Sequence, residues 1–172
     1  MNSSSLFEQE TFSSLFWFGL FTRGVGLLHV HPSLSLHPPY LFLDHVDEIV
    51  PGKYAKGFKN YTMNEWFFPV HYPTMPNVPG LLQVEALSHL AILTFLTLPG
   101  NKGMITNSLR VDNIKFIQRV VPGNRLYMEA QLHSWNRGIG KCSTQGYIEG
   151  KLVNQADFIF TIPDILDTYK PR

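Results

Sequence analysis

The 172-residue sequence has one cysteine, few charged residues and no long hydrophobic run. A single cysteine, Cys142, excludes an internal disulfide and permits a reducing compartment. No stretch reaches the roughly 18 apolar residues that a membrane-spanning helix needs, since Arg23 and several glycines interrupt residues 15–28. Glu8 and Glu10 stand where a secretory signal peptide has basic residues. We therefore expect a cytoplasmic protein without a membrane span, with an organelle stroma as the alternative location.

Charged residues are few, and the basic and acidic ones nearly balance. Charged residues make up 16% of the chain against 44% hydrophobic residues, and the net charge is +1 with a pI near 7.9. This balance gives no general attraction to nucleic acid, so we expect no nucleic-acid partner. His29, His31 and His37 come without a cluster of cysteines or carboxylates, so we expect no metal site. The apolar composition instead favours contacts buried between subunits.

The chain divides near residue 37. Residues 1–36 mix Ser, Phe, Gly and Leu without a sustained period, and we interpret them as an N-terminal appendage. Residues 37–172 are long enough for one domain with a buried core. Alternating patterns and turn residues predict strands at 40–46, on both sides of the Pro-Gly turn in 48–58, after Gly103, and at 125–135, 141–149 and 153–162.

One long helix is predicted from Gly80 to Leu98, between Pro79 and the pair Pro99-Gly100. Its apolar residues lie on every side, which indicates a helix wrapped by other structure. One such helix amid about six antiparallel strands predicts an α+β architecture, in which a curved sheet wraps around a central helix. The exposed face of that sheet would still need cover, which is a reason to expect a dimer.

The stretch from His71 to Glu85 is the most informative part of the chain. A Pro-x-x-Pro-x-x-Pro-Gly segment holds an extended loop that ends at a helix N-terminus, where free backbone N–H groups are placed to hold an oxyanion. Gly80 allows close approach, since it has no side chain. His71 and Glu85 fit an acid–base pair. The alternatives are a structural histidine and an ordinary surface carboxylate. His89 lies one turn after Glu85, so these two side chains can touch.

This stretch resembles the β-hydroxyacyl-acyl-carrier-protein dehydratases of type II fatty-acid synthesis, the FabZ type. That family has a His-(Phe or Tyr)-Pro-x-x-Pro-x-x-Pro-Gly motif with a catalytic Glu fourteen residues after the His, and positions 71 and 85 reproduce the spacing. Further matches lie at residues 39–44, 64–68 and 115–126. The resemblance runs in order from about residue 37 to 162.

The resemblance implies a hotdog fold and a homodimer, with a trimer of dimers as a larger assembly to consider. Each active site would take its His from one subunit and its Glu from the other. The implied substrate is a 3-hydroxyacyl chain on the phosphopantetheine arm of an acyl carrier protein. His71 would take the C2 proton, Glu85 would protonate the leaving 3-hydroxyl, and the Gly80 N–H would polarise the thioester carbonyl. The products are a trans-2-enoyl thioester and water, and no metal or organic cofactor is implied.

Two sets of residues bear on specificity in this reading. Val70 and Thr74 stand where the family usually has Gly, and His89 stands where it usually has Gln, beside the substrate site. These departures bear on substrate range and rate, and they leave two alternative functions open: a hotdog acyl thioesterase, and a catalytically impaired module that binds acyl carriers. The candidate contacts for an acidic carrier protein are Lys115, Arg119 and Arg125.

Overall fold

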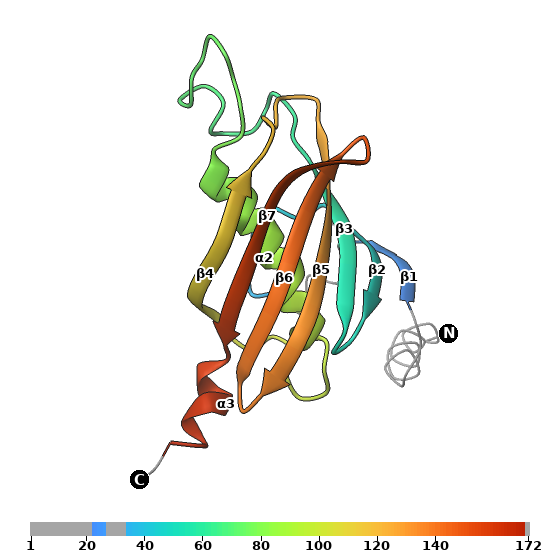
Figure 1. Ribbon diagram of the computed structural model, residues 1–172, viewed down its shortest axis with the longest axis vertical. Coiled ribbons are helices and arrows are strands. Elements are labelled where there is room, and N and C mark those ends of the chain that lie inside the picture. Colours follow the sequence, from blue (N-terminus) through green and yellow to red (C-terminus); the bar gives the residue numbers. More distant parts are fainter. Residues whose placement is uncertain (1–21, 27–33, 171–172) are drawn as a thin grey trace, which may run out of the picture.

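The computed structural model describes residues 22–26 and 34–170. Their strands form one antiparallel sheet in the order β1-β2-β3-β5-β6-β7-β4. Figure 1 shows the sheet curving around the long helix α2. The elements are β1 (Thr22–Gly26), β2 (His45–Val50), β3 (Tyr54–Asn60), α2 (Gly80–Leu96), β4 (Asn107–Phe116), β5 (Arg125–Asn136), β6 (Ile139–Ile148), β7 (Lys151–Thr161) and α3 (Pro163–Asp167). The predicted α+β architecture, with a sheet wrapped around a central helix, is confirmed.

Helix α2 begins at the predicted residue and ends two residues early, at Leu96. Pro79 takes the N-cap position, and the hydroxyl of Thr97 donates to the carbonyl of Leu93 at the other end. Every residue from 86 to 96 is buried, because α2 contacts β3, β5, β6 and β7. Burial of a leucine side chain contributes about 1.5–3 kcal/mol. The helix therefore owes its stability to the sheet around it.

The central strands carry the inner face of the core. Along β5, buried and exposed residues alternate, as expected where one face packs and the other meets solvent. The buried set, which faces α2, is Leu126, Met128, Ala130 and Leu132. The strands predicted at 125–135, 141–149 and 153–162 are thus confirmed as β5, β6 and β7 with small changes at their ends.

Strand β4 differs from the others. It pairs only with β7 in the described sheet, so its other edge is free. None of its residues is buried, and Leu109, Ile114 and Phe116 are exposed apolar side chains. Free strand edges with apolar side chains are templates for pairing with another chain.

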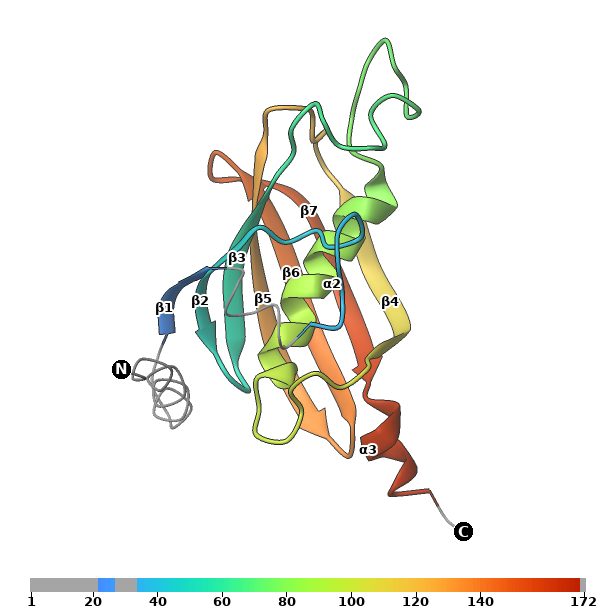
Figure 2. The ribbon, with the colours of Figure 1, turned by 180° about the vertical axis from the view of Figure 1, so that it is seen from behind.

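The strand predicted at residues 40–46 is wrong over its first half. Residues 40–44 join no strand, and β2 begins only at His45. Figure 2 shows the segment that contains them passing α2. There the backbone N–H of Phe42 donates to the Nδ1 atom of His89 on α2, at 3.1 Å. The N–H of Phe42 therefore donates to a side chain of α2 and not to a carbonyl of a neighbouring strand.

Two elements were not predicted. Strand β1 lies within the segment interpreted as an appendage, and its Thr22 stands opposite Ile49 of β2. Helix α3 follows β7 and starts with a proline. Among the described helices, none is long and apolar enough to cross a membrane. His29 and His31 lie outside the described residues, and the division of the chain at residue 37 stays a prediction.

Candidate active site

The segment between β3 and α2, residues 61–79, projects beyond the end of the sheet and carries His71 (Figures 1 and 2). Two aromatic side chains, Phe67 and Phe68, are buried and anchor it in the core. The backbone N–H of His71 donates to the carbonyl of Phe67 at 2.8 Å. Tyr72 has a φ of 55°, a left-handed conformation that is uncommon outside glycine and often marks functional segments. The segment is therefore folded back on itself around His71.

A buried ion-pair network holds the base of this segment. The Nζ atom of Lys59 lies 3.0 Å from Asp44 Oδ1 and 2.9 Å from Glu65 Oε1. Burial by itself lowers the pKa of Lys59, but hydrogen bonds to Glu65 and Asp44 and their charges outweigh it, so the pKa is raised. The ammonium thus stays charged and ties the start of the segment to the residue just before β2.

One ring nitrogen of His71 contacts the backbone, and the other has no hydrogen-bond partner among the described residues. The Nδ1 atom lies 3.0 Å from the carbonyl oxygen of Asn77. A carbonyl oxygen only accepts, so Nδ1 carries the hydrogen, and in the neutral ring Nε2 holds the lone pair. The ring also meets Tyr72 edge-on, at 4.6 Å between centroids. These two contacts hold the ring of His71 in place and leave Nε2 as the nitrogen that can accept a hydrogen bond.

The start of α2 leaves free donors beside this segment. No side chain caps the helix, and the carbonyl of Pro79 accepts from the N–H groups of Leu82 and Gln83. Within the described part of the chain, the N–H groups of Gly80 and Leu81 have no acceptor. The ring of Phe116 covers Gly80 so closely that an added Cβ would lie 2.8 Å from its Cζ. A side chain at position 80 would therefore make the ring of Phe116 shift.

Glu85 lies on the second turn of α2 with its side chain 32% exposed. The Nε2 atom of His89 lies 3.0 Å from its Oε1. Because Nδ1 of His89 accepts from the N–H of Phe42, the hydrogen of the neutral ring is on Nε2 and points to the carboxylate. The contact predicted between Glu85 and His89 is confirmed.

Tyr40 joins this pair, although the sequence pattern did not single it out. Its ring meets the ring of His89 edge-on, with centroids 6.1 Å apart. Burial, followed by the charge of Glu85, raises the pKa of Tyr40. No signal in the sequence pointed to this packing, because Tyr40 and His89 are distant along the chain.

The two proposed proton carriers stay separate within one chain. Among the described residues, no hydrogen bond or ion pair joins His71 to Glu85. His71 lies on the projecting segment, and Glu85 lies on the helix that follows it. Within the described part of a single chain, His71 and Glu85 are therefore not joined directly.

The candidate carrier contacts gather at the same end of the molecule. Lys115 is the neighbour of Phe116, which covers Gly80. Arg119 donates to the sulfur of Met75 on the projecting segment. Arg125 donates to Asn60 at 2.7 Å and lies over the ring of Phe58. All three are exposed basic side chains.

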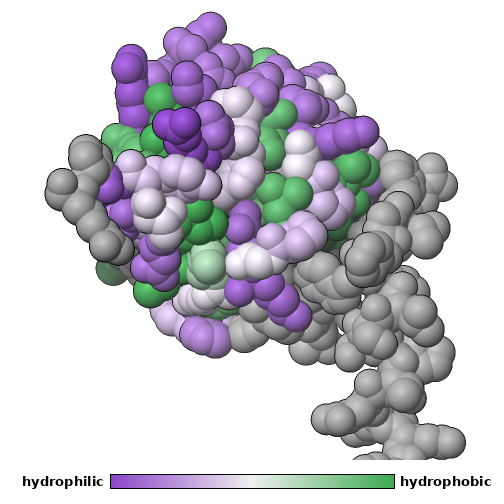
Figure 3. Space-filling model, turned by 90° about the horizontal axis from the view of Figure 1, so that it is seen from below, coloured by the Kyte–Doolittle hydropathy of each residue, from purple (hydrophilic) through white to green (hydrophobic). Residues whose placement is uncertain are grey.

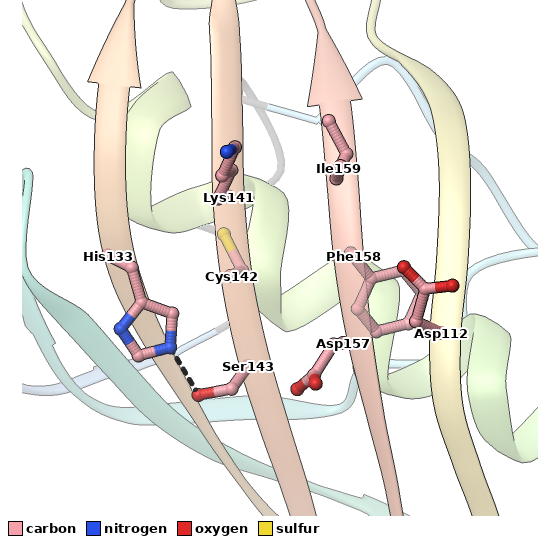
Figure 4. A pocket seen from close by; sticks show the side chains of 8 residues that line it. All are labelled: Asp112, His133, Lys141, Cys142, Ser143, Asp157, Phe158 and Ile159. Atoms are coloured by element: carbon pink, nitrogen blue, oxygen red, sulfur yellow. Dashed lines mark hydrogen bonds between the residues drawn. The ribbon is translucent and has the colours of Figure 1, made fainter.

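A hollow of ≈ 310 Å³ lies on the outer face of the sheet, away from α2 (Figure 4). His133 from β5 and Ser143 from β6 point to the same side there, with Nε2 and Oγ 2.7 Å apart. Ser143 stands opposite Gln131 of β5 and Asp157 of β7, and His133 lies where the register of β5 and β6 shifts between Leu132 and Ser134. Neighbouring Cys142 is buried, and burial raises the pKa of its thiol to about 12, so it is a packing residue. This hollow does not include His71 or Glu85.

Comparisons with known proteins show similarity over most of this chain. The family described as the FabA-like domain matches residues 35–157. The 3-hydroxyacyl-acyl-carrier-protein dehydratase FabZ of Acetivibrio thermocellus is 37% identical over 126 residues, which cover 73% of this chain and 86% of that protein. The protein of the same name from Herpetosiphon aurantiacus is 38% identical over 131 residues, covering 76% of this chain and 93% of its own.

Solved structures share the fold at much lower identity. The dehydratase heterocomplex ApeI:P from Xenorhabdus doucetiae matches with a TM-score of 0.67 and 12% identity, covering 82% of this chain and 97% of that one. The E. coli PaaI protein from the phenylacetic acid degradation operon matches with a TM-score of 0.53 and 12% identity, covering 68% of this chain and 77% of its own. These matches bear on the fold alone, and the predicted hotdog fold is confirmed.

Proposed function

Because this chain belongs to the FabA-like domain family and is similar to FabZ dehydratases over most of its length, we propose that it dehydrates 3-hydroxyacyl thioesters on an acyl carrier protein. The products would be trans-2-enoyl thioesters and water, as in type II fatty-acid synthesis. The observation that carries the proposal is the orientation of His71, whose Nδ1 is held by the carbonyl of Asn77. This leaves Nε2 as a base on the segment that leads to the helix terminus and Glu85.

The proposed reaction uses groups that are all side chains or backbone of this chain. His71 Nε2 takes the C2 proton, and the electrons of that C–H bond form the C2–C3 double bond. The 3-hydroxyl leaves with a proton from Glu85, so water forms, His71 becomes positive and Glu85 becomes negative. Proton exchange with solvent restores both. The free N–H of Gly80 would hold the thioester oxygen as negative charge develops on it. The chemistry needs no metal or organic cofactor.

A homodimer would complete this site. The exposed apolar residues Leu109, Ile114 and Phe116 lie on β4, and Leu81 on the first turn of α2 is 75% exposed. Phe116 also covers Gly80, so the apolar surface adjoins the helix terminus. At the opposite end of the molecule, apolar and hydrophilic residues intermingle across the described surface in view (Figure 3). A second copy on β4 would bury this surface and bring its own His71 toward Glu85, and dimers of this kind would be the units of any trimer of dimers.

The acyl carrier protein would dock at the same end. Lys115, Arg119 and Arg125 offer positive charge there, and carrier proteins of this pathway are acidic, as the family resemblance implies. We propose the cytoplasm as the compartment, since the one cysteine suits reducing conditions.

One assay tests the proposal against its alternatives. The purified protein is incubated with 3-hydroxyacyl carrier thioesters of several chain lengths. We expect the conjugated enoyl thioester to accumulate in the wild type and not in His71→Ala. Release of free carrier thiol would show a thioesterase instead. Binding of the carrier with neither product would show an impaired binding module.

A further inference from the structure

Two amide side chains form a hydrogen-bonded relay from the sheet to the end of the projecting segment. Asn154 of β7 donates from Nδ2 to Oε1 of Gln83 on α2, at 2.8 Å. Gln83 in turn donates from Nε2 to the carbonyl oxygen of Val78, at 3.0 Å. Both amide side chains are buried. The relay therefore joins three parts of the fold beside the first turn of α2, the helix that carries Glu85.

The last acceptor of the relay fixes the orientation of both amides. A backbone carbonyl only accepts, so the amide nitrogen of Gln83 faces Val78 and its oxygen faces Asn154. Asn154 must then donate, and its own oxygen, Oδ1, has no hydrogen-bond partner among the described residues. Buried acceptors are normally paired. Oδ1 also lies so close to Gly146 of β6 that an added Cβ there would clash with it. The donor supplied to Gln83 is therefore the hydrogen bond that gives position 154 a reason to hold an amide.

Val78 is the residue at which the relay reaches the base of the site. Its carbonyl accepts from Gln83, and its N–H donates to the carbonyl of Val120 at 2.7 Å. The peptide that contains this N–H also contains the carbonyl of Asn77, which lies 3.0 Å from Nδ1 of His71. The ring of His71 is thus held by a peptide group that is itself fixed by a neighbouring hydrogen bond on each side.

We propose that Gln83 and Asn154 are positioning residues, which hold the base and the oxyanion donor of the site in place relative to its acid. The base is His71, the oxyanion donor is the N–H of Gly80, and the acid is Glu85. The inference rests on the function proposed above. Neither amide takes part in proton transfer. Without the relay, the carbonyl at the end of the segment loses its donor, and the peptide that holds the imidazole can rotate.

The kinetic test removes the relay without shortening a side chain. Gln83→Met removes both hydrogen bonds of this side chain. We expect kcat to fall about 10-fold with KM within twofold, the scale of a slightly misplaced base. Asn154→Ala leaves Gln83 able to donate to Val78 but frees its amide to turn, so kcat should fall by a smaller factor. Unchanged kcat in Gln83→Met would overturn the proposal.

The matched control is Thr144→Val, which removes a buried side-chain hydrogen bond elsewhere in the core. The hydroxyl of Thr144 on β6 donates to the carbonyl of Ala156 at 2.8 Å, away from the projecting segment. This variant should lose melting temperature, as Gln83→Met does, but keep wild-type kcat. An equal loss of kcat in the control would show that general destabilisation lowers turnover, and would overturn the positioning role.

A second measurement does not depend on turnover, and Asn154→Ala provides it even where Gln83→Met does not fold. Histidine rings are labelled with 15N, and the signals of His71 are assigned by their loss in His71→Ala. At a pH where the ring is neutral, we expect the hydrogen on Nδ1 in the wild type and a larger share on Nε2 in both amide variants, because the carbonyl of Asn77 is no longer held in place. Thr144→Val should match the wild type. An unchanged tautomer in the amide variants would overturn the proposal. If the tautomer changes but the wild type does not dehydrate, the proposed function fails while the positioning stands.

Discussion

His89 donates through Nε2 to Glu85 Oε1 at 3.0 Å, one helical turn away, and its other nitrogen accepts from the backbone of Phe42. A buried imidazole thus links the candidate acid to the chain segment before β2. The family residue at this position, glutamine, also has a donor and an acceptor, which explains how histidine can stand in its place.

We predict that residue 89 must supply a hydrogen-bond donor to Glu85 and an acceptor to Phe42, and that a residue other than histidine can do so. His89→Gln retains a donor for Glu85 and an acceptor for Phe42, so turnover should stay within a few-fold of the wild type. His89→Leu removes both, leaves the buried N–H of Phe42 without a partner, and should cost about 1–3 kcal/mol in the free energy of unfolding. Urea unfolding and kcat for both variants check this. Equal stability of the leucine variant and the wild type would contradict it.

The two proton carriers should be separable from the fold. We predict that His71→Ala and Glu85→Gln each lower dehydration at least ~100-fold, the scale for losing a positioned acid or base. Both side chains are partly exposed, so both variants should keep the circular dichroism and size of the wild type. Near-normal turnover in either would remove the proposed mechanism.

Mixing these two inactive variants tests the shared site. In a heterodimer, one of the two sites would combine an intact His71 with an intact Glu85, so some activity should return. Subunit exchange is verified with differently tagged chains. Exchange without recovered activity would show that His71 and Glu85 of the same chain work together.

The main elements could be predicted because each depends on a local pattern. Helix α2 has flanking prolines and apolar residues on all sides, and β5 alternates along its length. The segment at 40–44 misled because Leu41, Phe42 and Leu43 are all buried. A short apolar run of this kind looks the same whether it packs in a sheet or against a helix. The acceptor of the Phe42 N–H depends on tertiary packing, which a local sequence pattern does not contain.

The candidate site could also be predicted only where it depends on a local sequence pattern. The spacing of His71, Gly80 and Glu85 could be seen in the sequence, since a rigid loop and a helix start lie between them. The packing of Tyr40 against His89 could not, because it depends on how residues 34–44 pass α2. The close approach of the Phe116 ring to Gly80 could not be predicted from the sequence either.

Gly80 should be intolerant of a single methyl group for a steric reason. Its backbone is helical, so alanine would suit the local conformation. The new Cβ would lie 2.8 Å from Phe116 Cζ, however, so the half-exposed ring of Phe116 would have to shift. We predict that Gly80→Ala lowers kcat/KM at least ~10-fold, and that adding Phe116→Ala restores part of it. The double variant should also regain melting temperature relative to Gly80→Ala. No recovery in either measurement would show that the ring is not the obstacle.

The residues before the first family match should serve assembly rather than chemistry. Strand β1 covers one edge of β2 and lies at the opposite side of the sheet from β4. Deleting residues 1–33 removes β1 and leaves the β2 edge with unpaired backbone groups, which favour aggregation. We predict turnover within a few-fold of the wild type but a lower concentration at which the protein aggregates, measured by light scattering. Deletion of residues 1–21 keeps β1 and is the matched control, so it should aggregate no more than the full chain. Complete loss of activity in a folded 1–33 deletion would show instead that this segment helps to form the site.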